Sequence, residues 1–377
     1  MIAASPTTQA TITAAPTTEA TTTEATTTEA QTSEAQTSEA PTTEAMTAEP
    51  GRAYAPAALQ ALAAFGVEPA ELHFVNLSEN VTFRATDGRD GSPLVLRLHR
   101  PWYHDIAALR SEHLWTRALV QAGIAAPEPL LTPAGENFAR VEIAATGERR
   151  WAGLARWVEG ELLGDVVARE TDRAANARHF ARLGAIMAGM HDQATGWTPP
   201  AGFQRHALDA DGLMGHEPWW GPFWEHAIFS PAERDMLLAT RDRLHAALTR
   251  YGKPARTFSL IHADLHPHNV LINGAHAAVI DFDDSGFGWH QYDLAVALVA
   301  YQDHPDFAVF RDASIAGYRS VRTISDADLA LLRMFLLIRD LVQMGWFHQR
   351  PELQRAAVLP RIKERICRKA AHFELPV

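Results

Sequence analysis

The period at which apolar residues recur changes once along this chain, and that change restricts the folds it can form. In the front half, up to Trp157, short segments alternate apolar with polar residues and are rich in β-branched and aromatic side chains, as strands are. From Asp172 onward, apolar residues recur at the spacing of helices that face a core. The sequence therefore predicts a sheet-rich front half and a helical back half.

The front half is expected to begin with a short helix over residues 56–65. Three antiparallel strands follow in the segments HFVNL, VTFRAT and PLVLRLH, with a DGRDG turn between the last two. We expect a helix over residues 106–120 and two further strands over residues 138–144 and 151–157. This order of elements builds a small antiparallel sheet with one helix packed on it.

The back half contains one exception to its helical pattern. Helices are expected over residues 172–191 and 231–251, with three or four more between residues 292 and 372. Between them, the segments NVLI and AAVID flank an NGAH turn, which predicts two short strands joined as a hairpin. We therefore predict an α+β, bilobal fold, with a sheet-rich N-lobe at residues 53–158 and a larger helical C-lobe at residues 159–377 that carries the hairpin.

The first 52 residues form a separate segment of low complexity. From Pro16 to Pro50 the chain runs in pentapeptides such as TTTEA and QTSEA, each with one glutamate. A segment without aromatic residues cannot bury enough apolar surface to offset its chain entropy, so residues 1–52 are predicted to be a disordered tail. The seven glutamates between Pro16 and Pro50 supply most of the net charge of −11 and leave −4 for the rest of the chain. We interpret the tail as a solvating extension, with partner docking or phosphorylation as the alternative.

Composition argues against several classes of partner. The acidic net charge and the lack of a dense Lys/Arg cluster argue against nucleic acid. The longest apolar run, Leu294 to Ala300, is far shorter than the roughly 20 residues that a membrane-spanning helix needs, and the N-terminus lacks the features of a secretory signal. The single cysteine, Cys367, excludes an intrachain disulfide. We expect a cytoplasmic protein with no membrane partner; the sequence leaves its oligomeric state open.

Three polar residues surround the predicted hairpin. The segment LIHADLHPHNVLINGAHAAVIDFDD places Asp264 and Asn269 before the first strand and Asp281 after the second. Because the second strand returns along the first, Asp281 is expected to come back to the vicinity of Asn269. Two oxygen ligands then meet at the open end of the hairpin and suit Mg²⁺, while Asp264 faces the same space. Phosphoryl transfer requires metal ligands and a carboxylate that orients the acceptor hydroxyl.

In type, order and spacing these residues resemble the HxDxxxxN and IDxxD elements of the phosphotransferase family that includes aminoglycoside phosphotransferases, homoserine kinases and choline kinases. The resemblance covers most of residues 70–350 and is closest to the homoserine kinase-like and stress-response kinase A branches. It implies a protein kinase-like fold that uses ATP and Mg²⁺. By position, Asp264 is similar to the catalytic base, His262 to the residue that braces the loop, and Asn269 and Asp281 to the metal ligands.

The resemblance also implies nucleotide-binding residues in the front sheet. Arg97, in VLRLHRP, takes the position of the lysine that contacts the ATP phosphates, a departure because arginine and lysine hold phosphate differently. Glu112, on the next helix, is similar in position to the glutamate that pairs with that cation. The alternatives are that Arg97 is a solvated strand residue and that Glu112 is a surface residue of its helix.

A loop of Ser78, Glu79 and Asn80 stands where protein kinases have a glycine-rich phosphate loop, but it contains no glycine. The motif SENxxF nevertheless resembles the corresponding turn of homoserine kinases and stress-response kinases, whose backbone amides can face phosphate. The alternative is that the three residues are ordinary turn formers.

Three aspartates follow the hairpin strand that ends at Asp281. Asp293 resembles the family's aspartate that anchors the backbone of the catalytic loop; the alternative is a first-turn aspartate favoured by the helix dipole. Asp283 and Asp284 are interpreted as a solvent-facing pair, with contact to a second Mg²⁺ as the alternative.

Two other classes of function compete with a kinase. The cluster of His262, Asp264, His266 and His268 has the donor types of a zinc hydrolase, but a zinc site would not explain Asn269 or the front sheet. A nucleotide-binding module without catalysis is the second alternative.

The acceptor is expected to carry a hydroxyl group. The interval from Asp281 to Asp293 leaves no segment comparable to the activation loop of regulated protein kinases, which favours a small molecule; phosphorylation of protein serine or threonine is the alternative. The segment from Trp197 to Glu225 is rich in aromatic and acidic residues, and we interpret it either as core or as a wall of the acceptor pocket. We therefore predict an ATP-dependent phosphotransferase that acts on a small-molecule hydroxyl.

Overall fold

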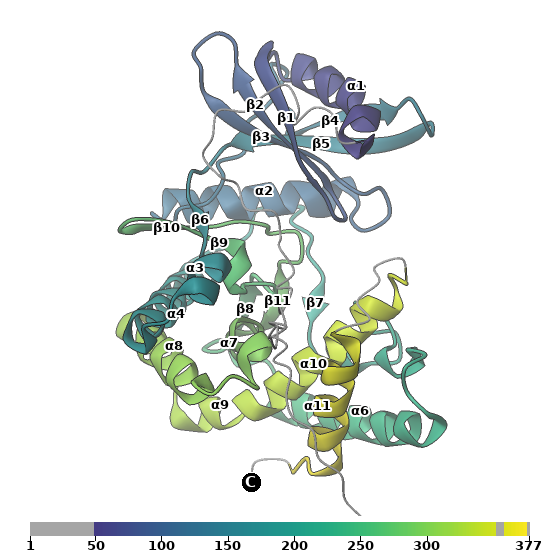
Figure 1. Ribbon diagram of the computed structural model, residues 1–377, viewed down its shortest axis with the longest axis vertical. Helices are drawn as coiled ribbons and strands as arrows, with labels where there is room; N and C mark the ends of the chain where they lie inside the picture. Colours follow the sequence, from purple (N-terminus) through teal and green to yellow (C-terminus); the bar gives the residue numbers. More distant parts are fainter. Residues whose placement is uncertain (1–48, 352–357, 375–377) are drawn as a thin grey trace, which may run out of the picture. The chain divides into compact units, whose positions relative to one another are not determined.

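A computed structural model describes residues 49–351 and 358–374 of the protein (Figure 1). Their secondary structure divides into a sheet-rich N-lobe and a helical C-lobe, so the predicted α+β, bilobal organisation is confirmed. The predicted disorder of residues 1–48 lies outside the described residues.

The N-lobe begins with a helix that starts earlier than the sequence predicts. Helix α1 (Glu49–Ala64) includes residues 49–52, which the sequence analysis assigns to the disordered tail, so that boundary is wrong. Pro50 stands in the first turn of the helix, where the N–H that proline lacks would have no helical partner. The proline therefore permits a helix start within the last pentapeptide.

The N-lobe sheet is antiparallel throughout and packs on α1. Its five strands lie in the order β1-β2-β3-β5-β4, and the three front strands and two later strands that the sequence predicts are all present. The strands are β1 (Pro69–Leu77), β2 (Val81–Asp87), β3 (Pro93–Leu98), β4 (Phe138–Ile143) and β5 (Glu148–Arg156).

Strand periodicity separates the two faces of this sheet. On β3, Leu94, Leu96 and Leu98 are buried in the N-lobe core, which places Arg97 on the opposite face. On that second face lies α2 (Ile106–Gln121), whose residues Glu112 and Trp115 are buried (Figure 1). The leucines of β3 therefore face the N-lobe core, and Arg97 faces the side of the sheet on which α2 lies.

The C-lobe is built mainly from helices, as the sequence predicts, with short strands between them. The helices are α3 (Leu163–Arg169), α4 (Arg173–Gly196), α5 (Ala210–Met214), α6 (Pro231–Tyr251), α7 (His290–Leu298), α8 (Phe307–Val321), α9 (Asp326–Ala330), α10 (Leu332–His348) and α11 (Leu359–Ala371). Single 3₁₀ turns lie at Phe223–Glu225, Pro267–Asn269 and Val299–Tyr301.

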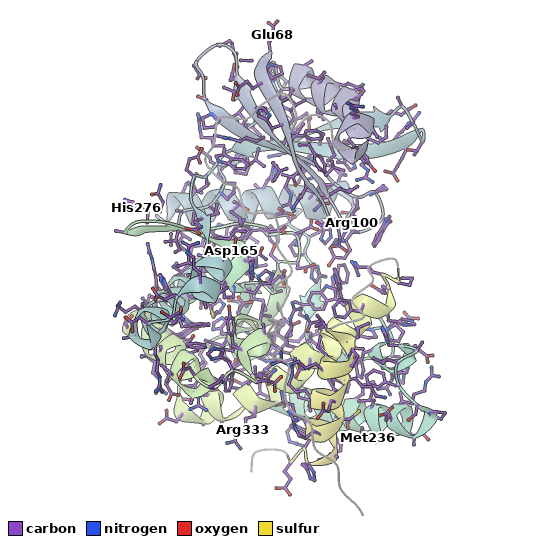
Figure 2. The ribbon with its side chains drawn as sticks, in the orientation of Figure 1. Glu68, Arg100, Asp165, Met236, His276 and Arg333 are labelled. Atoms are coloured by element: carbon purple, nitrogen blue, oxygen red, sulfur yellow. The ribbon has the colours of Figure 1, made fainter. Side chains whose placement is uncertain are left out.

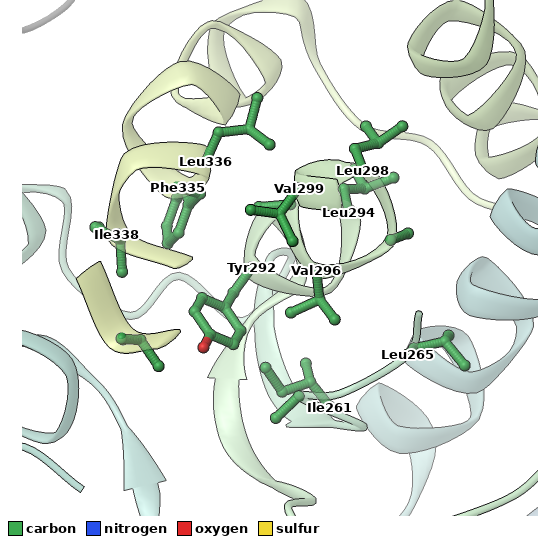
Figure 3. Close-up of a cluster of buried hydrophobic side chains, with 14 of the residues drawn as sticks. Ile261, Leu265, Tyr292, Leu294, Val296, Leu298, Val299, Phe335, Leu336 and Ile338 are labelled. Atoms are coloured by element: carbon green, nitrogen blue, oxygen red, sulfur yellow. The ribbon is translucent and has the colours of Figure 1, made fainter. Parts of the chain in front are cut away.

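Helix α7 is the centre of the C-lobe core. Every residue from His290 to Leu298 is buried, as expected for a helix that is mostly apolar all round. Figure 3 shows Tyr292 and Val296 of this helix among Phe335 of α10 and Ile261. Functional groups at the start of α7 are therefore fixed by packing on all sides.

The predicted hairpin is present within the C-lobe. Strand β9 (Val270–Asn273) pairs with β10 (His276–Val279) in antiparallel register, and β6 (Glu161–Leu162) adds to the other edge of β9. Figure 2 shows His276 near the turn. At the opposite end, the backbone N–H of Val279 donates to the carbonyl of Ala125, 2.9 Å away, which ties the hairpin to the segment after α2.

A second small sheet in the C-lobe is absent from the sequence prediction. It has the order β7-β11-β8 and consists of β7 (Ala207–Leu208), β8 (Phe258–Ile261) and β11 (Gly286–Trp289). Such short strands carry too few residues to show a period, and β11 contains two glycines. No helix in the described part of the chain is both long and apolar enough to cross a membrane.

Helices α4 and α8 pack closely at two glycines. A Cβ atom on Gly184 would lie 2.0 Å from the carbonyl oxygen of Ser314, and one on Gly317 would lie 1.8 Å from that of Ala181. Both distances are far below van der Waals contact with backbone atoms, so the helices would have to separate.

We expect Gly184→Ala to reduce the free energy of unfolding by about 1–3 kcal/mol, the usual cost of overpacking a core. Gly189→Ala, in the same helix, is the matched control, because its nearest neighbour would be a side-chain carbon of Ile124 at 4.0 Å. That control is expected to stabilise the protein by about 0.5–1 kcal/mol through its helix propensity. Denaturant unfolding of both variants checks this, and equal effects would contradict the packing argument.

Candidate active site

The backbone of the loop after β8 is held by a buried carboxylate. Asp293, in the first turn of α7, accepts the N–H of His262 at 3.0 Å and that of Ala263 at 2.7 Å. His191 also lies 3.0 Å from this carboxylate. Burial raises the pKa of Asp293 to about 6, although the hydrogen bonds from the loop act in the opposite direction. Asp293 is thus a loop anchor, and the alternative of a first-turn aspartate that serves only the helix dipole is wrong.

Two residues of the loop and hairpin adopt a backbone conformation that is uncommon for residues with side chains. Ala263 has φ 66° and Asp281 has φ 65°, and they are the only described residues other than glycine with positive φ. Such conformations cost about 1–3 kcal/mol each and occur mainly where the surrounding structure enforces them. The hydrogen bonds that His262 and Ala263 donate to Asp293 enforce the turn at Ala263, immediately before Asp264.

His262 braces the loop from within. Its Nε2 lies 3.0 Å from the carbonyl of Ile280, an acceptor, so Nε2 carries the proton. Its Nδ1 then accepts the N–H of Asp264 at 3.3 Å. Burial lowers the pKa of His262, which keeps the ring neutral. Both ring nitrogens are occupied by backbone groups, so His262 links the loop to the end of the hairpin.

The carboxylate of Asp264 is held at both oxygens. Arg339 donates to Oδ1 at 2.6 Å, while Asn269 donates to Oδ2 at 3.1 Å and His266 lies 3.3 Å from the same oxygen. Burial raises the pKa of Asp264, but His266 and Arg339 outweigh that effect and hold it well below its usual value. Asp264 is therefore ionised at neutral pH in a fixed orientation.

Arg339 is a site residue that the sequence analysis missed. It lies 75 positions from Asp264 along the chain, on α10, yet it forms an ion pair with that carboxylate. It also donates to the hydroxyl of Tyr292 at 3.4 Å. The one signal in the sequence is an arginine and an aspartate within the otherwise apolar run MFLLIRDLV.

The hairpin brings Asp281 back to Asn269, as predicted. Val270 pairs with Val279, and the N–H of Ile280 donates to the carbonyl of Asn269 at 3.0 Å. The side-chain nitrogen of Asn269 donates to the backbone oxygen of Asp264 at 2.8 Å. This fixes the amide orientation and leaves its oxygen as the atom able to face a cation.

Arg97 reaches Asp281 and not the glutamate expected from the resemblance. Its guanidinium donates to the Asp281 carboxylate at 2.6 Å. Within the described ranges no ion pair joins Arg97 to Glu112, whose nearest cation is Arg205 at 3.9 Å. The alternative of a solvated strand residue at Arg97 is nevertheless wrong, because its side chain is 22% exposed and pairs with Asp281 of the other lobe.

Glu112 is buried and incompletely paired. Its Oε2 atom has no hydrogen-bond partner in the described structure. Burial and the charge of Asp283 raise the pKa of Glu112 to about 7, against the attraction of Arg205 and Arg97. The alternative of a surface glutamate is therefore wrong.

The loop of Ser78, Glu79 and Asn80 joins the lobes through side chains. Glu79 forms ion pairs with Arg100 and with Arg350 of the C-lobe. The Asn80 amide donates to Asp283 at 3.4 Å and accepts the N–H of Arg100 at 3.1 Å. Glu79 and Asn80 therefore do more than form a turn; contact of this loop with phosphate remains a prediction.

Asp283 is not solvent-facing. It is 8% exposed and accepts hydrogen bonds from Asn80 and from Arg100, the latter at 3.3 Å. Burial raises its pKa, but Arg97 and the neighbouring cationic groups outweigh this and lower it. Asp284 is half-buried, and the hydroxyl of Tyr103 donates to it. The interpretation of a solvent-facing pair is wrong.

The residues proposed as alternative zinc ligands have separate partners. His262 contacts backbone groups, His266 lies beside Asp264, and His268 lies 3.5 Å from Asp165. Across residues 49–351 and 358–374, no group of three or more His, Cys, Asp or Glu side chains could hold a metal ion. The arrangement around Asp264 is instead one anchored carboxylate next to an amide and a second aspartate.

A two-lobed fold with this loop and hairpin defines a kinase-like phosphotransferase. The model of the phosphotransferase enzyme family matches residues 72–334, so the chain belongs to that family. It is a phosphotransferase with an alcohol group as acceptor, as the resemblance implies.

Individual relatives agree with this assignment. The structure is similar to that of a microcompartment-associated aminopropanol kinase, with 30% identity and a TM-score of 0.72, over 84% of this chain and 97% of the other. An amicoumacin kinase of Bacillus subtilis is 24% identical over 77% of this chain and 83% of its own length. A homoserine kinase of Methylorubrum populi is 31% identical over 57% of this chain and 60% of its own length.

The raised pKa of Glu112 makes a prediction about stability and pH. The folded protein retains this proton up to about pH 7, whereas the ordinary pKa is 4.5, so the stability contributed by the protonated carboxyl is lost as pH rises across that window. We expect Glu112→Gln to be about 1–3 kcal/mol more stable than the wild type at pH 8 and nearly equal to it at pH 4.5. Thermal unfolding at both pH values measures this.

Glu136→Gln is the control, because Glu136 is exposed and pairs only with exposed Arg110. Its difference from the wild type should not change with pH. If Glu112→Gln shows the same stability difference at both pH values, Glu112 does not titrate as described.

Proposed function

We propose that this protein transfers the γ-phosphate of ATP to a hydroxyl of a small molecule, with Asp264 as the catalytic base and Asn269 and Asp281 as ligands of Mg²⁺. The observation that carries the proposal is the juxtaposition of these three residues by one anchored loop and one hairpin. Phosphoryl transfer depends on positioning and on charge stabilisation more than on covalent chemistry by the protein. In this proposal the anchored loop and the hairpin provide the positioning, and the ion held by Asn269 and Asp281 would provide the charge stabilisation.

Asp264 is suited to orient an acceptor hydroxyl. Arg339 and Asn269 fix its two oxygens, so the carboxylate cannot rotate away from the loop. An ionised carboxylate accepts the hydrogen bond of the hydroxyl and then its proton as the bond to phosphorus forms. His262 and Asp293 do not contact the acceptor in this proposal; they hold the backbone that presents Asp264.

The residues at the hairpin end fit Mg²⁺. Asn269 offers an amide oxygen and Asp281 a carboxylate that is 45% exposed, both hard oxygen donors. When bound there with nucleotide, the ion supplies charge that stabilises the transferring phosphoryl group. Arg97 contacts Asp281 from the N-lobe, so its guanidinium lies beside this position and can hold phosphate oxygens.

A small alcohol is the acceptor that the comparisons favour over protein serine or threonine. Matched relatives include proteins named homoserine kinase and aminopropanol kinase, which the chain resembles at about the same level of identity. The two tryptophans Trp219 and Trp220 donate to the hydroxyl of Tyr103 and belong to or pack against the C-lobe core, which fits the interpretation of this aromatic segment as core.

We expect Asp264→Ala to lower the rate of phosphoryl transfer by about two orders of magnitude or more, as loss of a positioned base does. Nucleotide affinity should be nearly unchanged, because Asp264 contacts the acceptor and not ATP in this proposal. Steady-state transfer of labelled γ-phosphate and nucleotide titration measure the two effects. Asp264→Asn preserves the side-chain size and should be equally inactive; full activity in either variant removes Asp264 from the mechanism.

We expect Asp281→Asn to weaken Mg²⁺-dependent binding of ATP by about tenfold or more, since it removes a charged ligand. Titration of a fluorescent ATP analogue with and without Mg²⁺ measures this. Asp312→Asn, a change at an exposed position of α8 next to Arg311, is the control and should bind like the wild type. Unaltered Mg²⁺ dependence in Asp281→Asn would show that this aspartate is structural.

A further inference from the structure

The segment at residues 204–208 lies between helix α2 and the loop that follows Asp281. On one side, the N–H of Gln204 donates to the hydroxyl of Ser111, on α2, at 2.8 Å. On the other side, strand β7, at the end of the segment, pairs in parallel with β11, which follows the loop (Figure 1). The segment therefore connects an N-lobe helix to the backbone beyond the catalytic hairpin.

Arg205, within this segment, is a buried cation directed at backbone carbonyls. Its side chain is 1% exposed. It donates to the carbonyl of Ser285 at 2.5 Å, to that of Phe282 at 3.4 Å and to that of Asp283. A further bond, at 3.3 Å, joins it to the carbonyl of Ala108 on α2. A guanidinium has five N–H donors in one rigid plane, so this one side chain can hold several carbonyls at fixed positions.

The charge of Arg205 is balanced mainly by these carbonyl groups. Its one ion pair in the described structure is with Glu112, at 3.9 Å, which is longer than a hydrogen bond. Burial of a cation is unfavourable unless its donors are satisfied. The conformation of the loop that turns its carbonyls toward Arg205 is therefore the one that satisfies this cation.

The segment and the loop also approach each other closely at Gly286. The carbonyl of His206 accepts the N–H of Phe287 at 2.9 Å. A Cβ atom on Gly286 would lie 2.8 Å from that carbonyl oxygen and 2.9 Å from Nε2 of the His206 ring. Both distances are below van der Waals contact, so a side chain at this position would push the loop away from the segment. This backbone contact is independent of Arg205.

The loop that Arg205 holds begins directly after Asp281. Phe282 and Asp283 are the next two residues, so bonds to their carbonyls restrict rotation of the backbone that carries the Asp281 carboxylate. Asp281 has φ 65°, a conformation that persists only where the surrounding structure enforces it. Residues that orient a metal ligand without touching the metal change metal affinity by about 10–100-fold when they are mutated.

We propose that Arg205 is a positioning residue for Asp281. By holding the loop carbonyls against α2, its guanidinium sets the orientation of the carboxylate that binds Mg²⁺. The inference rests on the proposed function, because it requires Asp281 to be a metal ligand. It also gives α2 a part in the metal site, since the same guanidinium bonds to the carbonyl of Ala108.

Arg205→Lys tests this role, because lysine keeps the positive charge near Glu112 but lacks the planar group that reaches several carbonyls at once. We expect the variant to need about tenfold or more Mg²⁺ for half-maximal binding of a fluorescent ATP analogue. Its affinity for the analogue without Mg²⁺ should equal that of the wild type, because Arg205 acts through Asp281. Circular dichroism and thermal unfolding check that the variant folds.

Gly286→Ala tests the same hold through a different residue and provides the test if Arg205→Lys does not fold. The added methyl group would displace the loop from His206. The Mg²⁺ requirement should therefore rise in this variant as well, again without a change in Mg²⁺-free affinity.

Arg182→Met is the matched control. Arg182 also donates to two backbone carbonyls of the hairpin, those of Gly274 and Ala275, but these lie at the turn, at the opposite end of the strands from Asp281. This variant should require the same Mg²⁺ concentration as the wild type. An equal increase in Arg182→Met would overturn the inference, because any lost bond to the hairpin would then have the same effect.

Hydrogen exchange of the loop distinguishes this inference from the proposed function. Without metal or nucleotide, Arg205→Lys should exchange the amides of residues 282–289 severalfold faster than the wild type. A wild-type Mg²⁺ requirement in folded Arg205→Lys would overturn the inference and leave the proposed function intact, as would an equal loss of affinity with and without Mg²⁺. Nucleotide binding that is independent of Mg²⁺ in the wild type would contradict the proposed function, and faster exchange in Arg205→Lys would then still show that Arg205 holds the loop.

Discussion

The arrangement of the active site depends on one buried carboxylate. Asp293 accepts two backbone N–H groups from the loop at His262 and Ala263, and it is itself fixed in the first turn of a helix that is buried along its whole length. Without these bonds, two amide donors would be left buried and unpaired, at a cost of about 1–3 kcal/mol each, and the left-handed turn at Ala263 would lose its support. The position of Asp264, one residue further along, follows from this anchor, so the core of the C-lobe determines the chemistry at its surface.

Whether a contact of the site could be predicted from the sequence depended on how far apart its residues lie along the chain. Asp264, Asn269 and Asp281 lie within one loop and one hairpin, where a short turn fixes the register, and their proximity was predictable. The burial of Asp283 and the ion pair of Arg339 with Asp264 join segments far apart in the chain, and no periodicity reports such contacts. The strands β8 and β11 were missed for a related reason: each has four residues and is stabilised by its partner more than by its own composition.

Arg97 illustrates a different limit. Its strand and face were predictable from the alternation of leucines around it, and the structure confirms that it leaves the N-lobe core. Its partner was not predictable, because Asp281 and Glu112 are both acidic and both face the same region between the lobes. Because Arg97 pairs with Asp281, Glu112 is left buried with one oxygen that has no hydrogen-bond partner in the described structure.

The origins of the groups around Tyr103 have an evolutionary consequence. The loop that carries Asp264 is held by Asp293 of α7, whereas Trp219 donates to the hydroxyl of Tyr103 and, among the described residues, forms no hydrogen bond with that loop. A substitution of Trp219 can therefore change the surroundings of Tyr103 without removing a hydrogen bond from the loop. The segment around Trp219 and the loop at Asp264 are thus held by different contacts, so the sequence of one segment can change while the hydrogen bonds that hold the other are retained.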